Sequence, residues 1–327
     1  MRHRTLHAEL GASGAISLPV LEVGSAGPLV VITGNIHGDE ATGVVACHRL
    51  AAALHGNMGH GRVVMLPSLN PAGLAQMVRV VPMDGADLNR VFPGSVTGTA
   101  TQRLAARIWQ ELVRLSPAAV IDLHADSALS IPYVIADRPV DLPVDERIGL
   151  EARVLEMAVA TGITVVHEYP DDEYRRYALD RSLAGAVVNR LRRPAVTIEA
   201  GGRRLIDAAA VDTMVYAVAG VLAWLGVATV PRGSPPARVA GGPWRRANAI
   251  RSREAGVLVP LVSPGARFEA GEVIGEVRTV AGEVRERLTA RESGMVIAWA
   301  DTAWVAAGGG VATIAVAEHS GRSGAGG

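Results

Sequence analysis

The feature that most limits the fold is an alternation of short apolar runs, rich in β-branched residues, with helix-length amphipathic segments between Pro28 and about Leu225. The apolar runs predict strands at Leu29–Thr33, Arg62–Leu66, Ala119–Leu123, Thr164–His167 and Ala195–Ile198. The segments between them predict helices at Ala41–Leu54, Thr101–Leu115, Glu146–Ala160, Arg181–Leu191 and Asp207–Leu225. Such alternation is typical of an α/β sheet with helices on both faces.

The residue pattern changes after Val230, and a chain of 327 residues is long enough for about two domains. Residues 231–243 form a proline- and glycine-rich stretch that predicts a linker. Short alternating strands follow over 244–318, and the glycine-rich residues 319–327 are expected to be a disordered tail. We therefore expect one domain over 1–230 and an all-β domain over 244–318.

The second region contains an internal repeat. Glu254–Val277 aligns without gaps to Glu292–Ala315, and Gly256 then coincides with Gly294. Coincident glycines favour a duplicated β unit over a chance likeness of apolar segments. The pattern resembles the two halves of a lipoyl-type barrel-sandwich domain. Because the sequence contains no lysine, such a domain cannot carry a lipoyl or biotinyl group, and its role here is structural or substrate-gating.

Charge and cysteine content exclude several classes of protein. The 32 basic residues balance 32 acidic ones, so no bulk charge favours nucleic acid or an anionic membrane. All the basic residues are arginine, which excludes Schiff-base catalysis, pyridoxal phosphate attachment and a P-loop lysine. The single cysteine, Cys47, excludes an internal disulfide and a cysteine-rich metal site.

The sequence indicates a soluble, cytoplasmic protein. The N-terminal residues lack an apolar core of signal-peptide length. Thr213–Val230 is free of formal charge, but its alanine and glycine content favours a buried helix over a membrane span. A homo-oligomer is compatible with base rates alone.

Two short segments predict a metal site. His37 and Glu40 form an H-x-x-E pair directly after a predicted strand, and His124 ends another strand. Ligands of open α/β folds bind at the carboxyl ends of such strands. Two histidines and a glutamate are a normal ligand set of catalytic zinc and leave a fourth position for water. Asp122 or a backbone carbonyl would orient the His124 ring; the alternative is a histidine that only caps a buried strand.

Further polar residues are candidates for catalysis. Glu199 comes directly after the predicted strand Ala195–Ile198, where a carboxylate suits a general base toward water and then an acid toward a leaving amine. Asn89 and Arg90 lie in a predicted loop, where an arginine fork and an amide suit a carboxylate. Arg79 would stabilise an oxyanion. Each of these side chains is also compatible with a solvated or purely structural role.

Four segments in this order, GNIHGDE, DLNRVFPG, DLHAD and TIEAGG, resemble the succinylglutamate desuccinylase/aspartoacylase family, zinc enzymes related to the metallocarboxypeptidases. The resemblance implies a zinc-carboxypeptidase-like mixed sheet flanked by helices over 1–230. It implies one Zn²⁺ per chain, held by His37, Glu40 and His124. It further implies Glu199 as the catalytic carboxylate, Arg79 at the scissile carbonyl, and Asn89 with Arg90 at the substrate carboxylate.

The function that follows is zinc-dependent hydrolysis of the amide bond of a small N-acyl amino acid, with no nucleic-acid or membrane partner. A metallocarboxypeptidase acting on peptides is the nearest alternative. An alternative of another class is a non-catalytic protein that binds a small molecule in an inherited crevice. A third alternative is that the β repeat is the functional part of the protein and acts as an interaction module.

Overall fold

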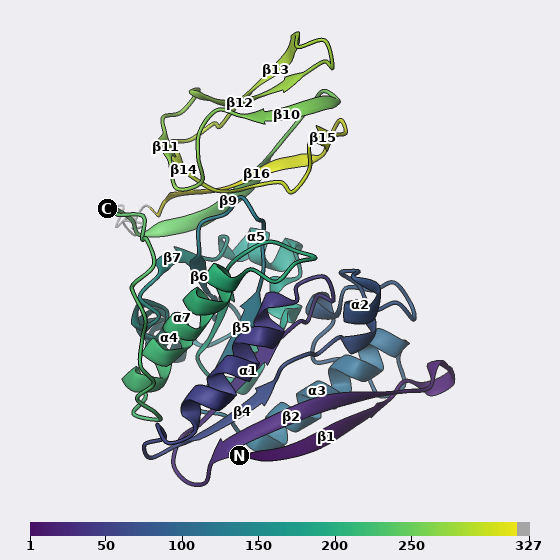
Figure 1. Ribbon diagram of the computed structural model, residues 1–327, viewed down its shortest axis with the longest axis vertical. Coiled ribbons are helices and arrows are strands. Elements are labelled where there is room, and N and C mark those ends of the chain that lie inside the picture. The colour runs from purple at the N-terminus through teal and green to yellow at the C-terminus, as the bar shows by residue number, and fades with distance from the viewer. Residues whose placement is uncertain (319–327) are drawn as a thin grey trace. The chain divides into compact units, whose positions relative to one another are not determined.

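The strands predicted between Pro28 and Leu225 form the centre of a mixed sheet in the computed structural model, which describes residues 1–318 (Figure 1). The sheet order in this part of the chain is β1-β2-β4-β3-β5-β8-β6-β7. These strands are β1 (Arg2–Glu9), β2 (Ala15–Gly24), β3 (Leu29–Gly34), β4 (Arg62–Leu66), β5 (Ala119–His124), β6 (Tyr133–Ala136), β7 (Thr164–His167) and β8 (Ala195–Glu199). The central strands β4, β3, β5 and β8 are parallel, whereas β1, β2 and β6 introduce antiparallel pairs.

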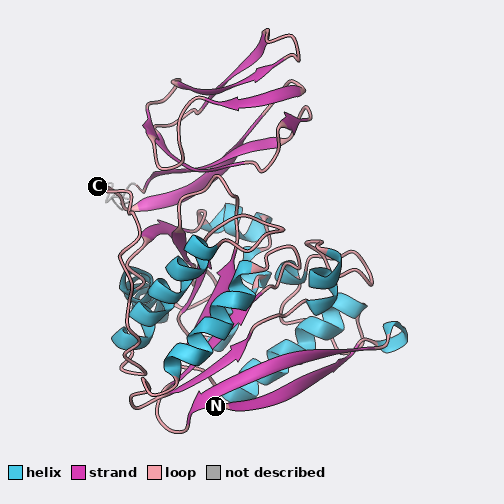
Figure 2. Ribbon diagram, viewed as in Figure 1, coloured by secondary structure: helices cyan, strands magenta, loops and turns pink. Residues whose placement is uncertain are grey.

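Helices cover both faces of this sheet (Figure 2). On one face α7 (Ala208–Trp224) packs between α1 (Thr42–Leu54) and α4 (Val144–Ala160). The β3–α1–β4 and β4–α3–β5 connections run in opposite directions along the sheet, so right-handed crossovers put α3 (Ala100–Leu115) on the other face. The remaining helical segments of this unit are η1 (Gly11–Ser13), α2 (Pro71–Gln76), η2 (Leu88–Arg90), α5 (Asp171–Arg176), η3 (Leu179–Arg181), α6 (Leu183–Ala186) and η4 (Val187–Leu191).

Helix boundaries follow from local capping. The Thr99 side chain accepts from the Gln102 amide, and the Gln102 side chain accepts in return from the Thr99 amide, so α3 begins with a capping box. Asp207 caps α7, the helix that contains most of the uncharged stretch 213–230. Among residues 1–318, no helix is long and apolar enough to cross a membrane.

The helix predicted over Arg181–Leu191 is instead broken into η3, α6 and the π-helical turn η4. Ser182 is extended, and its side chain accepts from the Gly185 amide, which begins a new helix. The Asn189 amide donates to the Gly185 carbonyl at 2.9 Å, a polar contact inside the helix that periodicity does not reveal.

The described residues divide into two compact units, Met1–Arg238 and a second unit that begins at Val239, a division that lies between residues 231 and 243. The predicted disordered tail, 319–327, lies outside the described residues. The described part of the second unit consists of strands and loops (Figure 2).

The second unit has two antiparallel sheets. One contains, in order, β9 (Trp244–Arg251), β16 (Gly310–Ala317), β14 (Gly294–Trp299) and β11 (Arg267–Phe268). The other contains β13 (Val284–Thr289), β12 (Val273–Arg278), β10 (Gly256–Pro260) and β15 (Trp304–Val305). Each repeat segment consists of a strand, a two-residue strand and a further strand. In each segment the two longer strands lie in one sheet and the two-residue strand lies in the other sheet.

Candidate metal centre and active site

A buried asparagine shapes the loop that carries His37 and Glu40. Asn35 follows β3 with φ of 52°, a left-handed conformation that asparagine tolerates better than most residues. Its Nδ2 donates to the carbonyls of His37 at 2.9 Å and Gly38 at 3.0 Å. The Ser68 hydroxyl donates to Asn35 Oδ1 at 2.6 Å. These bonds hold the loop in a turn at the end of β3, from which the side chains of His37 and Glu40 project.

Close backbone packing makes glycine necessary at position 38. A Cβ there would overlap the backbone of Gly73 in α2. The Gly38 amide donates to the Arg79 carbonyl at 3.2 Å, which brings the segment after α2 beside the loop. The H-x-x-E pair is therefore positioned by residues far from it in sequence.

His124 ends β5, which is parallel to β3, so its side chain leaves the same edge of the sheet as the His37 loop. Its Nε2 lies 2.8 Å from Asp122 Oδ2, and the Thr33 hydroxyl donates to Asp122 Oδ1 at 2.6 Å. Of the two orienting groups left open by the sequence, the side chain of Asp122 is the one in contact. Such a carboxylate fixes the tautomer and orientation of a ligating imidazole.

The three predicted ligands meet at one point. The Oε1 atom of Glu40 lies 2.7 Å from His37 Nδ1, and its Oε2 lies 2.9 Å from His124 Nδ1. All three side chains are buried, and their ligand atoms lie within 4.8 Å of one another. Residues from two different strand ends thus form a cluster of His37, Glu40 and His124 that could hold a metal ion.

The donor set fits a zinc ion. His37 Nε2 lies 3.3 Å from Asp87 Oδ1, and Asp122 faces Nε2 of His124, so each imidazole has a carboxylate behind it. When the ring protons are on the Nε2 atoms, both Nδ1 atoms can bind a metal ion together with the Glu40 carboxylate. Two imidazoles and one carboxylate are a normal catalytic zinc set.

Electrostatics within the cluster favour its charged forms. Burial opposes ionisation of Glu40, but the imidazoles of His37 and His124 hold the pKa of its carboxyl well below its ordinary value. Burial likewise opposes charge on His124, but Asp122 and Glu40 raise the pKa of its imidazole well above its ordinary value. Opposite charges within the cluster thus stabilise one another.

Arg79 lies at the margin of this cluster. Its Nε and Nη2 atoms donate to Asp87 Oδ2 at 3.2 and 3.1 Å, and its Nη1 lies 3.5 Å from Glu40 Oε1. Although burial alone would raise the pKa of Asp87, its contacts with His37 and Arg79 hold that pKa well below the ordinary value. Asp87 was not a predicted site residue; its only local signal is its position as the N-cap of η2.

Asn89 and Arg90 lie in η2, and the side chains of both form hydrogen bonds with other residues of the protein. Asn89 is buried, and its Oδ1 accepts from the Leu183 amide at 2.7 Å. The Nη1 atom of Arg90 donates to the Asn89 carbonyl at 2.6 Å, and the Arg90 charge helps to lower the pKa of Asp87. Arg90 thus lies close enough to Asp87, which faces His37, to interact with its charge.

Glu199 is the last residue of β8, beside His124. The two residues are partners in the parallel ladder between β5 and β8, and Tyr133 of β6 is the partner of Glu199 on its other side. Partners in register project from the same face of a sheet. Glu199 is partly exposed, whereas His124 is buried.

The chain is similar to several known proteins. Residues 26–225 match the model of the succinylglutamate desuccinylase/aspartoacylase catalytic domain. A segment of 142 residues is 36% identical to the N-alpha-acetyl-L-2,4-diaminobutyric acid deacetylase of Halomonas elongata. That segment covers 43% of this chain and 41% of the deacetylase, less than half of either protein.

Solved structures share the fold over almost the whole chain. An aspartoacylase family protein from Mesorhizobium loti is similar with a TM-score of 0.79 at 23% identity, over 97% of this chain and 95% of that one. The product-bound ectoine utilization protein EutE from Ruegeria pomeroyi is similar with a TM-score of 0.80 at 22% identity, over 96% and 95%. The matching structures confirm the mixed α/β fold and its β-rich C-terminal region.

Proposed function

Because the chain belongs to the succinylglutamate desuccinylase/aspartoacylase family, we propose that it is a zinc-dependent deacylase that hydrolyses the amide bond of a small N-acyl amino acid. The observation that carries this proposal is the buried meeting of His37, Glu40 and His124, with a carboxylate behind each imidazole. The similar Halomonas elongata protein, named as a deacetylase of an N-acetyl amino acid, supports the substrate class.

His37, Glu40 and His124 would hold the ion. A zinc ion in such a site polarises a carbonyl and makes water acidic enough to attack near neutral pH. Asp87 and Asp122 would keep the two imidazoles oriented and neutral at Nδ1. The burial of all three ligands excludes bulk water, which strengthens each of these interactions.

Glu199 would move the proton. Its place beside His124 at the end of β8 lets its carboxylate take a proton from the attacking water and then deliver that proton to the leaving amine. Arg79 would donate to the carbonyl oxygen as negative charge develops on it. Asn89 and Arg90 would bind the substrate carboxylate from η2, the short helix that Asp87 caps.

For the second unit we propose a barrel-sandwich architecture of the lipoyl type, supported by the exchange of short strands between its two sheets. Without lysine it has no attachment point for a prosthetic group, so its role would be to limit access to small substrates. A cytoplasmic location and a homo-oligomeric state remain predictions from the sequence.

The direct test is amine release, measured by mass spectrometry, from zinc-loaded protein offered N-acetyl, N-succinyl and N-formyl amino acids and short peptides. We expect hydrolysis of at least one acyl amino acid, and its loss when the zinc is chelated. Release of C-terminal residues from peptides alone would assign a carboxypeptidase instead. Silence across the panel together with no bound zinc would refute the proposal.

A further inference from the structure

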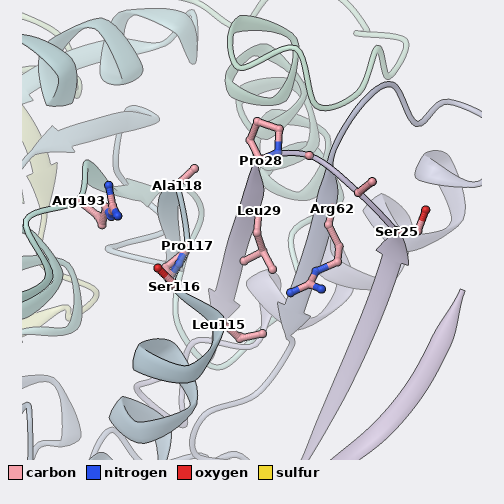
Figure 3. Close-up of a pocket in the computed structure, with 11 residues that line it drawn as sticks. Ser25, Pro28, Leu29, Arg62, Leu115, Ser116, Pro117, Ala118 and Arg193 are labelled. Atoms are coloured by element: carbon pink, nitrogen blue, oxygen red, sulfur yellow. The ribbon is translucent and has the colours of Figure 1, made fainter.

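A pocket lies at the amino ends of the central strands, away from the candidate metal centre. It has a volume of about 410 Å³, within the range of about 300–1,000 Å³ typical of small-molecule sites. Figure 3 shows the side chains that line it: Leu29 at the start of β3, Arg62 at the start of β4, Ser116 and Pro117 after α3, and Arg193 before β8. The pocket is thus built by segments that converge from four parts of the first unit.

This pocket is distinct from the candidate active site. His124 and Glu199 end β5 and β8, and the His37 loop follows β3, whereas the pocket residues precede those same parallel strands. A strand rises about 3.3 Å per residue, so strands of this length separate the two sites by roughly 15–20 Å. A ligand bound in the pocket would therefore not occupy the position of the substrate.

The charged side chains in its lining are both arginines. Arg62 and Arg193 line the pocket, and no aspartate or glutamate does. Within residues 1–318, the Nε atom of Arg62 is buried without a hydrogen-bond partner. A buried donor of this kind is costly unless an acceptor reaches it. The pocket therefore presents positive charge to whatever enters it.

The neighbouring carboxylates are already engaged elsewhere. Gly24 of β2 is the ladder partner of Arg62, so Glu22, two residues away, lies on the same face of the sheet. Glu22 accepts from Arg4 at 2.6 Å, and Glu111 of α3 accepts from Arg4 and Arg114, each at 2.5 Å. These acids are bound to other arginines, which leaves Arg62 to an external anion.

We propose that this pocket binds a phosphoryl group, either free phosphate or the phosphate of a small organic ester. A guanidinium fork matches the oxygens of phosphate and can bind two of them at once. The hydroxyls of Ser25 and Ser116 in the lining supply further donors. The volume exceeds what an inorganic oxyanion needs and leaves space for an organic part.

The test is calorimetric titration of the purified full chain with inorganic phosphate and, separately, glycerol 3-phosphate at constant ionic strength. We expect saturable binding of at least one probe, weakened about tenfold or more in Arg62→Gln and in Arg193→Gln, since each loses charge-assisted hydrogen bonds. Arg193 is exposed, so its replacement tests the site even where Arg62→Gln does not fold. Arg291→Gln, an exposed position of the second unit, removes the same charge and should leave the affinity unchanged.

Tighter binding of glycerol 3-phosphate than of phosphate would identify an organic phosphate as the ligand, and the reverse would identify the free ion. Both outcomes support the site. Absence of saturable binding of either probe by the unmodified protein overturns the proposal. Equal affinities in the unmodified protein, Arg62→Gln and Arg193→Gln overturn it as well. The readout is direct binding, so it is independent of the deacylase activity.

Discussion

His124 and Asp122 lie two residues apart on β5, and the 2.8 Å contact between His124 Nε2 and Asp122 Oδ2 determines which ring nitrogen faces Glu40. Alternate residues of a strand share a face, so this spacing places the carboxylate directly behind the imidazole. Thr33, one strand away, donates to the other oxygen of Asp122 and holds the carboxylate in place. Thr33 thus positions Asp122, and Asp122 positions the His124 ring so that its Nδ1 faces the centre of the cluster.

Asp122→Asn should weaken zinc binding about 10- to 100-fold, because the amide no longer holds the His124 ring in one tautomer. The measurement is a competition titration against a zinc chelator of known affinity. Asp212→Asn is a matched control, since Asp212 is exposed and pairs with Arg49 at the surface. Equal zinc affinities for Asp122→Asn and the control would show that the carboxylate has no part in metal binding.

Gly38→Ala should destabilise the first unit by about 1–3 kcal/mol, the usual cost of forcing atoms into a packed position. The added Cβ meets the backbone of Gly73, which cannot rotate away. Denaturant unfolding measures the change. Gly149→Ala, in α4 with no atom within 4 Å of the new Cβ, should instead stabilise by roughly 0.5–1 kcal/mol. An unchanged free energy of unfolding in Gly38→Ala would contradict the close packing of Gly38 against Gly73.

Because its thiol is buried, Cys47 should make the free energy of unfolding decrease as the pH rises. Burial, with a smaller effect of the Asp122 charge, raises the pKa of its thiol to about 12. In the unfolded chain the thiol ionises near pH 8.5, so alkaline pH favours the unfolded state until the folded pKa is reached. Between pH 8 and pH 10 the free energy of unfolding should drop roughly 2 kcal/mol more than in Cys47→Ala.

The comparison with Cys47→Ala isolates the thiol, because the cavity that this variant creates costs the same at both pH values. Identical pH dependence of the two proteins would mean that the thiol ionises as readily in the folded protein as in the unfolded chain.

The central strands could be predicted because their sequences are apolar on both faces. Leu29–Thr33 and Ala195–Ile198 are buried along their whole length, and each is one residue longer in the structure. The hairpin of β1 and β2 was not predicted. Arg2–Glu9 is an edge strand whose first residues are largely exposed and polar, so its apolar alternation extends over only its second half.

The ligand cluster was accessible from the sequence for a topological reason. Residues that follow parallel strands meet at one edge of the sheet, so His37 and His124 come together once their strands are identified. Asn35 and Asp87 were missed because their roles depend on partners brought close only by folding: Asn35 bonds Ser68, and Asp87 faces His37. A polar residue that follows a buried strand directly, as Asn35 does, is the signal that could have identified the first.

The most direct test of the proposed function is to measure zinc content and turnover together in Glu199→Gln. We expect one zinc per chain, as in the unmodified protein, with turnover of the identified acyl amino acid reduced on the order of 100-fold or more, because the amide cannot carry the proton. Near-normal turnover with zinc bound would contradict the role of Glu199, and loss of the zinc would assign Glu199 to metal binding instead of proton transfer.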